Sequence, residues 1–138
     1  MDHRDQAQRC LVEARAGWLP RDAFEHGEMD LVTAEILADL GRLDTAEQCA
    51  ASAVRTYGEG NRAYRTHAEL MLAEVHVRAG EPRGLVLARQ AIEAVSTLQS
   101  GAVRRERLVP LTAALEARPG NDAKEIARMA HQVAAMRV

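Results

Sequence analysis

Two helical runs in this chain end at a glycine, and each is followed after a tight turn by a second, alanine-rich helix. The first turn opens the segment GRLDTAEQCAASAV (41–54), and the second opens GEPRGLVLARQAIEAV (80–95). Glycine is favoured just past a helix C-terminus because it adopts a positive φ without strain. A helix–turn–helix unit that occurs twice within 138 residues predicts an all-α fold of stacked antiparallel helical hairpins.

The hairpins divide a chain whose length is typical of one domain, residues 1–138. We expect a cap or half-repeat at 1–17, a first unit at 22–58, a second at 61–99, and a degenerate third unit with the C-terminal helix at 102–136. About seven helices result from this division. Pro110 lies inside the helical pattern of the third unit, where proline lacks the backbone donor. We therefore expect a kink there, or a helix that restarts near Leu108.

Composition favours close helix packing and argues against a membrane protein. Aromatic residues make up only 3% of the chain, so the core has to be built from alanine, leucine, valine and methionine. No run of eighteen apolar residues occurs. Residues 1–4 lack the apolar core of a signal peptide. We expect no membrane contact and a cytoplasmic location.

Charge is unevenly distributed along the chain, although the formal net charge is only −2. Residues 1–60 hold six Arg against twelve Asp or Glu, whereas residues 101–138 hold seven Lys or Arg against four Asp or Glu. A helical stack also has two open ends, which expose apolar faces unless something covers them. Together these features predict a homodimer with a terminal helix in its interface.

The spacing of small residues resembles that of the tetratricopeptide repeat. The residues that carry the resemblance are Ala34, Gly41, Leu43, Ala46 and Ala53 in the first unit, Ala73, Gly80 and Ala88 in the second, and Ala113 and Gly120 in the third. The second unit fits only with a short insertion, and the large aromatic residues of the motif are absent. The resemblance implies a right-handed solenoid in which the first helix of each pair lines a concave face that binds a protein or peptide.

Longer segments resemble the C-terminal tetratricopeptide-like half of actinobacterial helix-turn-helix transcriptional regulators. These segments are GRLDTAE (41–47), AGEPRGL (79–85), RLVPLTAALEARPG (107–120) and AKEIARMAHQVAAMRV (123–138). This resemblance implies the effector-sensing or oligomerisation half of such a regulator. We see no DNA-binding domain in the sequence, so the chain is interpreted as a fragment of a regulator or as a stand-alone relative.

The repeat register carried over from the resemblance places a mixture of charged and apolar residues on the concave face. These residues are Glu28, Leu31, Glu35 and Asp39 from the first unit, His67, Leu70, Glu74 and Arg78 from the second, and Arg107 with Arg104 from the third. Such a groove is acidic at one end and basic at the other, which suits a peptide or a small-molecule effector carrying both charges. The alternative interpretation is a set of solvated helix faces, because any exposed helix carries such charges.

A second class of function is a small pathway enzyme or ligand-binding protein that uses the same groove. A carboxylate beside His67 could form an acid–base pair. No activated nucleophile, phosphate-binding glycine loop or cofactor motif accompanies it, so we assign no catalytic residue and expect no cofactor. Glu35, Asp39, His67 and Glu74 have the chemistry of metal ligands but not the spacing of a known motif, so we expect no metal.

Two further features are interpreted as surface features. His76 lies opposite the buried stripe of its helix and is expected at the surface. Arg104, Arg105 and Arg107 form a basic cluster, but the chain is acidic overall and has no recognition-helix pattern with interleaved aromatic residues. We therefore expect an acidic protein partner for the cluster and no direct contact with nucleic acid.

Overall fold

The computed structural model describes residues 23–57, 61–98 and 100–136, and within these ranges it contains helices and turns but no strand. The helices are α2 (Ala23–Asp39), α3 (Leu43–Thr56), α4 (Arg62–Arg78), α5 (Pro82–Val95), α6 (Gly101–Ala117) and α7 (Asn121–Ala135). The predicted all-α class is confirmed. The helix expected within residues 1–17 lies outside the described residues, which contain six helices. None of these six is both long enough and apolar enough to cross a bilayer.

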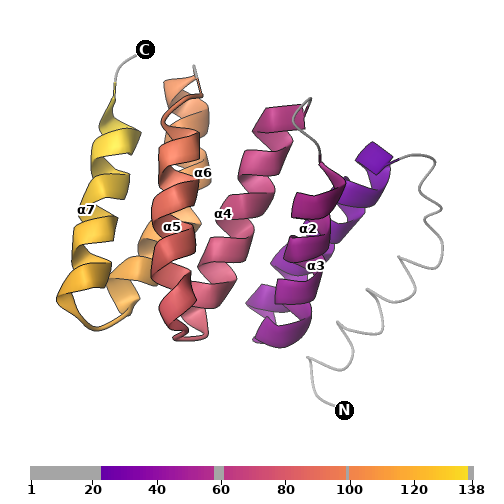
Figure 1. The fold of residues 1–138 in the computed structure, drawn as a ribbon, viewed down its shortest axis with the longest axis horizontal. Helices are drawn as coiled ribbons and strands as arrows, with labels where there is room; N and C mark the ends of the chain where they lie inside the picture. The colour runs from indigo at the N-terminus through magenta and orange to yellow at the C-terminus, as the bar shows by residue number, and fades with distance from the viewer. Residues whose placement is uncertain (1–22, 58–60, 99, 137–138) are drawn as a thin grey trace.

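The helices stand side by side along the long axis, from α2 and α3 at one end to α7 at the other (Figure 1). Each hairpin pair is in close contact, and α4 additionally contacts α2, α3 and α6. Because α4 touches four other helices, it is the central element of the described structure. Its side chains pack against α5 of its own hairpin and against helices of both neighbouring hairpins.

The two turns that the sequence singles out have the same geometry. Gly41 and Gly80 have φ values of 79° and 75°. The residue after each glycine donates its N–H to a carbonyl five residues back, Arg42 to Leu37 at 2.8 Å and Glu81 to His76 at 3.1 Å. This is the hydrogen bond of the Schellman motif, which satisfies carbonyls left free at a helix end. The predicted helix ends at both glycines are confirmed.

The buried side chains form two clusters that meet at α4. The first, which we call the alanine core, comprises Leu31, Ala34, Leu37, Ala38, Ala46, Cys49, Ala50, Ala53, Tyr57, Ala68, Met71 and Val75. The second, which we call the leucine core, comprises Leu70, Ala73, Val77, Ala88, Ala91, Ile92, Val95, Leu108, Leu111, Leu115, Ile126, Ala127, Ala130 and Val133. Alanine supplies half of the first cluster, so α2, α3 and α4 pack with little side-chain volume between them.

α6 continues without a break through Pro110, so the expectation that a helix restarts near Leu108 is wrong. Leu108 and Leu111 are buried on either side of the proline, at 0% and 1% exposure. Pro110 itself is exposed, as is Glu106, whose carbonyl would have accepted the missing hydrogen bond. Burial of the flanking leucines therefore holds the helix together, and the freed carbonyl belongs to a residue on the exposed side.

Candidate functional site

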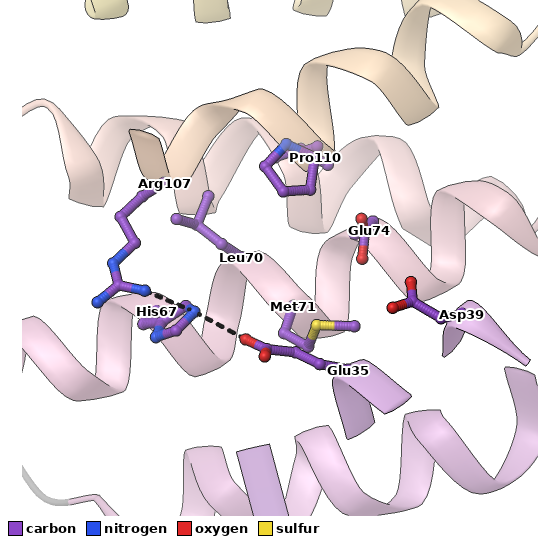
Figure 2. Close-up of a pocket in the computed structure, with 9 residues that line it drawn as sticks. Glu35, Asp39, His67, Leu70, Met71, Glu74, Arg107 and Pro110 are labelled. Atoms are coloured by element: carbon purple, nitrogen blue, oxygen red, sulfur yellow. Dashed lines mark hydrogen bonds and ion pairs between the residues drawn. The ribbon is translucent and has the colours of Figure 1, made fainter. Parts of the chain in front are cut away.

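A cavity of about 310 Å³ lies between α2, α4 and α6 (Figure 2). It is lined by Glu35 and Asp39 from α2, by His67, Leu70, Met71 and Glu74 from α4, and by Arg107, Pro110 and Leu111 from α6. On every helix these residues recur at intervals of three or four, with Leu70 and Met71, and Pro110 and Leu111, as adjacent pairs, which places them on one helical face. Each of the three helices thus presents a single face to the same cavity.

Opposite charges occupy opposite ends of this cavity. Arg107 and His67 lie at one end, and Asp39 and Glu74 lie at the other, with Leu70 and Met71 between them (Figure 2). Leu70, Met71 and Leu111 also belong to the two cores, so the apolar part of the lining is held by packing. The arrangement offers an apolar floor with a cationic end and an anionic end.

His67 connects the three helices through one ring nitrogen. Its Nε2 atom lies 3.0 Å from Nη1 of Arg107 and 3.4 Å from Oε1 of Glu35. A guanidinium only donates, so the Arg107 contact requires a lone pair on Nε2. The Glu35 contact requires a proton on that same atom. Nε2 can therefore make only one of the two hydrogen bonds at a time, and the position of the proton on the ring determines which one.

Glu74 is the titratable group in the cavity whose environment disfavours its charge. Burial raises the pKa of Glu74 above its usual value, Arg78 opposes this shift, and the carboxylates of Asp39 and Glu35 add to it. Arg78 is itself exposed and donates to the carbonyl oxygen of Ala38 at 2.9 Å. The anionic end of the cavity thus holds the Asp39 and Glu74 carboxylates, whereas Glu35 lies against His67 (Figure 2).

Six of the ten residues predicted for the groove line this cavity, namely Glu35, Asp39, His67, Leu70, Glu74 and Arg107. Glu28 is half-buried and outside it, and Arg78 is exposed beside it. Leu31 and Arg104 are buried, at 5% and 2% exposure, so neither is available to a ligand. Leu31 belongs to the stripe of α2 that faces the alanine core.

Arg104 lies one turn before Arg107 on α6, at the end of the helix that the C-terminal end of α7 covers. Its guanidinium donates to the carbonyl oxygen of Leu98 and, at 2.8 Å, to that of Met136. Its placement in the groove is therefore wrong, because its donors join the start of α6 to the end of α7. Within the described part of the chain it is a structural residue.

The sequence interpretation missed Met71, Pro110 and Leu111. A signal for two of them was present, because Pro110 and Leu111 follow Arg107 by three and four residues and so share its face. Met71 is not among the residues that the repeat register places on the concave face. It belongs to the alanine core and also reaches the cavity, because the cavity lies over the line where the two cores meet.

The expectation that His76 is a surface histidine is wrong, because the residue is only 8% exposed. Its Nδ1 lies 2.5 Å from Oε2 of Glu81, and its Nε2 lies 3.5 Å from Oε1 of Glu47. The expectation assumed that α4 has one buried and one free face. Because α4 is contacted by four helices, the side opposite its main stripe is also covered.

A second cavity of about 220 Å³ adjoins the first. The two share His67, Leu70 and Arg107, and the second is otherwise lined by Ala63, Tyr64, Thr66, Leu98 and Val103. Tyr64 stacks on the buried Tyr57 with ring centroids 5.6 Å apart, which limits its movement. Burial, with nearby Glu28, Tyr64 and Asp30, raises the pKa of Tyr57 to about 12, so its ring stays neutral.

In residues 23–57, 61–98 and 100–136, no three His, Cys, Asp or Glu side chains converge in a way that could hold a metal ion. Comparison with known proteins adds no relative: no protein-family model, no curated protein and no solved structure matches this chain. What the site can do is therefore argued from its geometry.

Proposed function

We propose that this chain is a tetratricopeptide-like binding module, a right-handed solenoid of hairpins whose ligand lies in the groove across α2, α4 and α6. It acts as the effector-sensing or oligomerisation part of a transcriptional regulator, or as a stand-alone relative, in the cytoplasm and without direct contact to nucleic acid. Support comes from the order of the helices: the first helix of each pair contributes to the cavity, as the resemblance to the repeat implies.

The ligand is a peptide, or a small-molecule effector, that carries both a cationic and an anionic or carbonyl group. One observation carries this proposal: Arg107 lies at one end of the cavity and the Asp39 and Glu74 carboxylates lie at the other, over an apolar floor. The volume of about 310 Å³ is at the lower end of the range for ligand pockets. The adjoining cavity extends the same groove.

The test is a selection of random dodecapeptides displayed on phage, together with a small-molecule library read by thermal shift. A ligand present at about one hundred times its Kd should stabilise the protein by about 2.7 kcal/mol through mass action. Arg107→Glu reverses the charge at one end of the cavity and should abolish the shift. Arg128→Glu, at an exposed position on α7, is the matched control and should keep it. Selected ligands that bind both variants equally would place binding elsewhere.

A small enzyme in the same groove is the second candidate. The observation that favours it is the approach of His67 Nε2 to Glu35 Oε1 at 3.4 Å, slightly longer than a hydrogen bond, which brings together the two groups of an acid–base pair. His67→Asn separates the two candidates, because it removes proton transfer and retains hydrogen bonding. Turnover that is lost while binding persists would favour the enzyme, and binding without turnover in either protein would favour the module.

We also propose that the module is a homodimer through a terminal helix. The argument is the opposite charge of the N-terminal and C-terminal segments and the open ends of a helical stack. Light scattering at tens of micromolar, in low and in high salt, tests it. A single species at the monomer mass of 15.1 kDa in both salts contradicts the proposal. Dissociation by salt would assign the contact to charge.

A further inference from the structure

We propose that the α2–α4 end of the first cavity binds the alkylammonium group of a lysine side chain, in a peptide that runs along α4 and places an apolar side chain in the second cavity. This inference rests on the proposed function and adds to it the chemistry that the groove selects. Its basis is the apolar lining of the cavity, the positions of the Asp39 and Glu74 carboxylates and the continuity of the two cavities.

The carboxylates at this end come from two helices, Asp39 from α2 and Glu74 from α4 (Figure 2). Glu35, one turn before Asp39 on α2, lies against His67 instead. A group held by Asp39 and Glu74 has to donate in more than one direction. An ammonium presents three donors from one compact centre, whereas a guanidinium presents a planar fork that suits a single carboxylate. The arrangement therefore favours lysine over arginine.

The apolar lining accounts for the stem of the ligand. Leu70, Met71 and Pro110 lie between the cationic and anionic ends of the cavity (Figure 2). A lysine side chain buries its methylene groups along apolar surface while its head remains with polar partners. A bare metal ion or a short ammonium would leave this floor uncovered. The cavity thus matches an ammonium that is carried on a flexible alkyl chain.

The second cavity and Arg107 distinguish a peptide from a free diamine. The two cavities share His67, Leu70 and Arg107, so one ligand can occupy both. The shared position carries a guanidinium, which can donate to a peptide carbonyl as the chain crosses from one cavity to the other. Beyond it, Tyr64, Leu98 and Val103 form an apolar wall. A free diamine has no group for either of these features.

The electrostatics of the cavity point the same way. Burial raises the pKa of Glu74, the Arg78 guanidinium opposes the shift, and the Asp39 and Glu35 carboxylates add to it. A bound ammonium favours the ionised carboxylate, so binding should release a proton from the fraction of protein in which Glu74 is protonated. The affinity for the cation should therefore increase as the pH rises through the titration of Glu74. An uncharged ligand would not have this pH dependence.

The probes are N-acetyl-lysine methylamide, its uncharged analogue N-acetyl-norleucine methylamide, and cadaverine, each titrated into the full chain and followed by ¹H–¹⁵N NMR. The lysine probe should shift amides of α2 and α4 around the cavity, with an affinity in the millimolar range. Glu74→Gln and Asp39→Asn should each weaken it by roughly three- to tenfold, the expected scale for one partly screened charge pair. Glu93→Gln, at an exposed position on α5, is the control and should leave the affinity unchanged.

Equal binding of the lysine and norleucine probes, or an unchanged affinity in Glu74→Gln, would overturn the inference. Tighter binding of cadaverine than of the lysine probe would assign the site to free amines. The proposed function is tested separately by the selected dodecapeptides. If these bind the groove without enrichment of lysine, the binding module stands and the lysine site falls. If they include a lysine, its replacement by arginine should weaken binding less than its replacement by norleucine.

Discussion

The alanine core and the leucine core solve the same packing problem in opposite ways. In the alanine core the helices touch through small side chains, and Ala46, Ala50 and Ala53 are all at 0% exposure. In the leucine core the space between α4, α5, α6 and α7 is filled by large side chains such as Leu108, Leu111 and Leu115. The stability of the alanine core depends on how closely its helices can approach one another. The stability of the leucine core depends on how completely side chains fill the space between its helices.

The candidate site lies where these two kinds of packing meet. Met71 belongs to the alanine core, Leu70 and Leu111 belong to the leucine core, and all three line the cavity. α4 contributes to both cores, since Ala68 faces one and Ala73 faces the other. On one side of α4 the helices approach closely, and on the other side large side chains fill the space between them. A groove lies over the seam, which is the line where the two cores meet, and the charged residues border that groove.

Emptying the leucine core should have the largest effect on stability. Leu108→Ala removes a side chain that is 0% exposed, and we expect the free energy of unfolding to fall by about 2–5 kcal/mol through lost transfer energy and a cavity. Urea denaturation followed by circular dichroism measures this change. Val109→Ala is the control on the next position of α6, because Val109 is 64% exposed. Equal losses in the two variants would contradict the assignment of the core.

Overfilling the alanine core should be the next largest effect. Ala53→Leu introduces three carbon atoms where α2, α3 and α4 leave no room, and we expect a loss of about 1–3 kcal/mol. Ala113→Leu places the same change at an exposed position of α6 and should have little effect. The comparison of the two cores would fail if Ala53→Leu melted within a degree of the parent protein, because the space assumed to be limiting would then be available.

Two helices approach closely in the second hairpin, at Gly84 of α5. A Cβ atom built there would lie 2.7 Å from the backbone nitrogen of Val77 and 2.8 Å from the carbonyl carbon of His76. Since a backbone cannot move aside as a side chain can, we expect Gly84→Ala to lose about 1–2 kcal/mol, after the higher helix propensity of alanine is allowed for. Calorimetry of this variant is the measurement. A gain in melting temperature would mean that α4 and α5 are farther apart.

Gly27→Ala is the matched comparison beside the alanine core. Its Cβ would meet the ring of Tyr57 at 2.6 Å, and that rigid ring is 1% exposed and stacked on Tyr64. We therefore expect a loss similar to that at Gly84. The pair of variants measures whether the helices or the side chains between them set the limit on packing.

Features set by the local sequence were the ones that could be predicted. The helix ends at Gly41 and Gly80 follow from the φ freedom of glycine, and Ala53, one of the small residues in the repeat spacing, is buried. The continuation of α6 through Pro110 could not be predicted from the local sequence. It depends on the packing of Leu108 and Leu111 against other helices, which a local rule about proline does not include.

The same distinction applies to the candidate site. Glu35 and Asp39, which the repeat register carried over from the resemblance assigns to one face of their helix, both line the cavity. Arg104 and His76 were misplaced because each is covered by an element distant in the sequence, the end of α7 for Arg104 and the packed neighbours of α4 for His76. A charged residue on a helix is exposed only where no other helix arrives, and single-helix periodicity does not contain that information.

The smallest expected effect concerns Glu74, which borders the seam between the two cores. Burial raises the pKa of Glu74 above its ordinary value of 4.5. Between 4.5 and that raised value the folded protein binds more protons than the unfolded chain, so the free energy of unfolding should decrease as the pH rises through this interval. Glu74→Gln removes this dependence. The variant should therefore gain stability relative to the parent as the pH rises from about 4 to neutrality.

Urea denaturation across this pH range measures the difference, with Glu93→Gln as the exposed control. A difference that stays constant with pH would mean that the Glu74 carboxylate is as well solvated in the folded protein as in the unfolded chain, and the seam would then not be a desolvated groove.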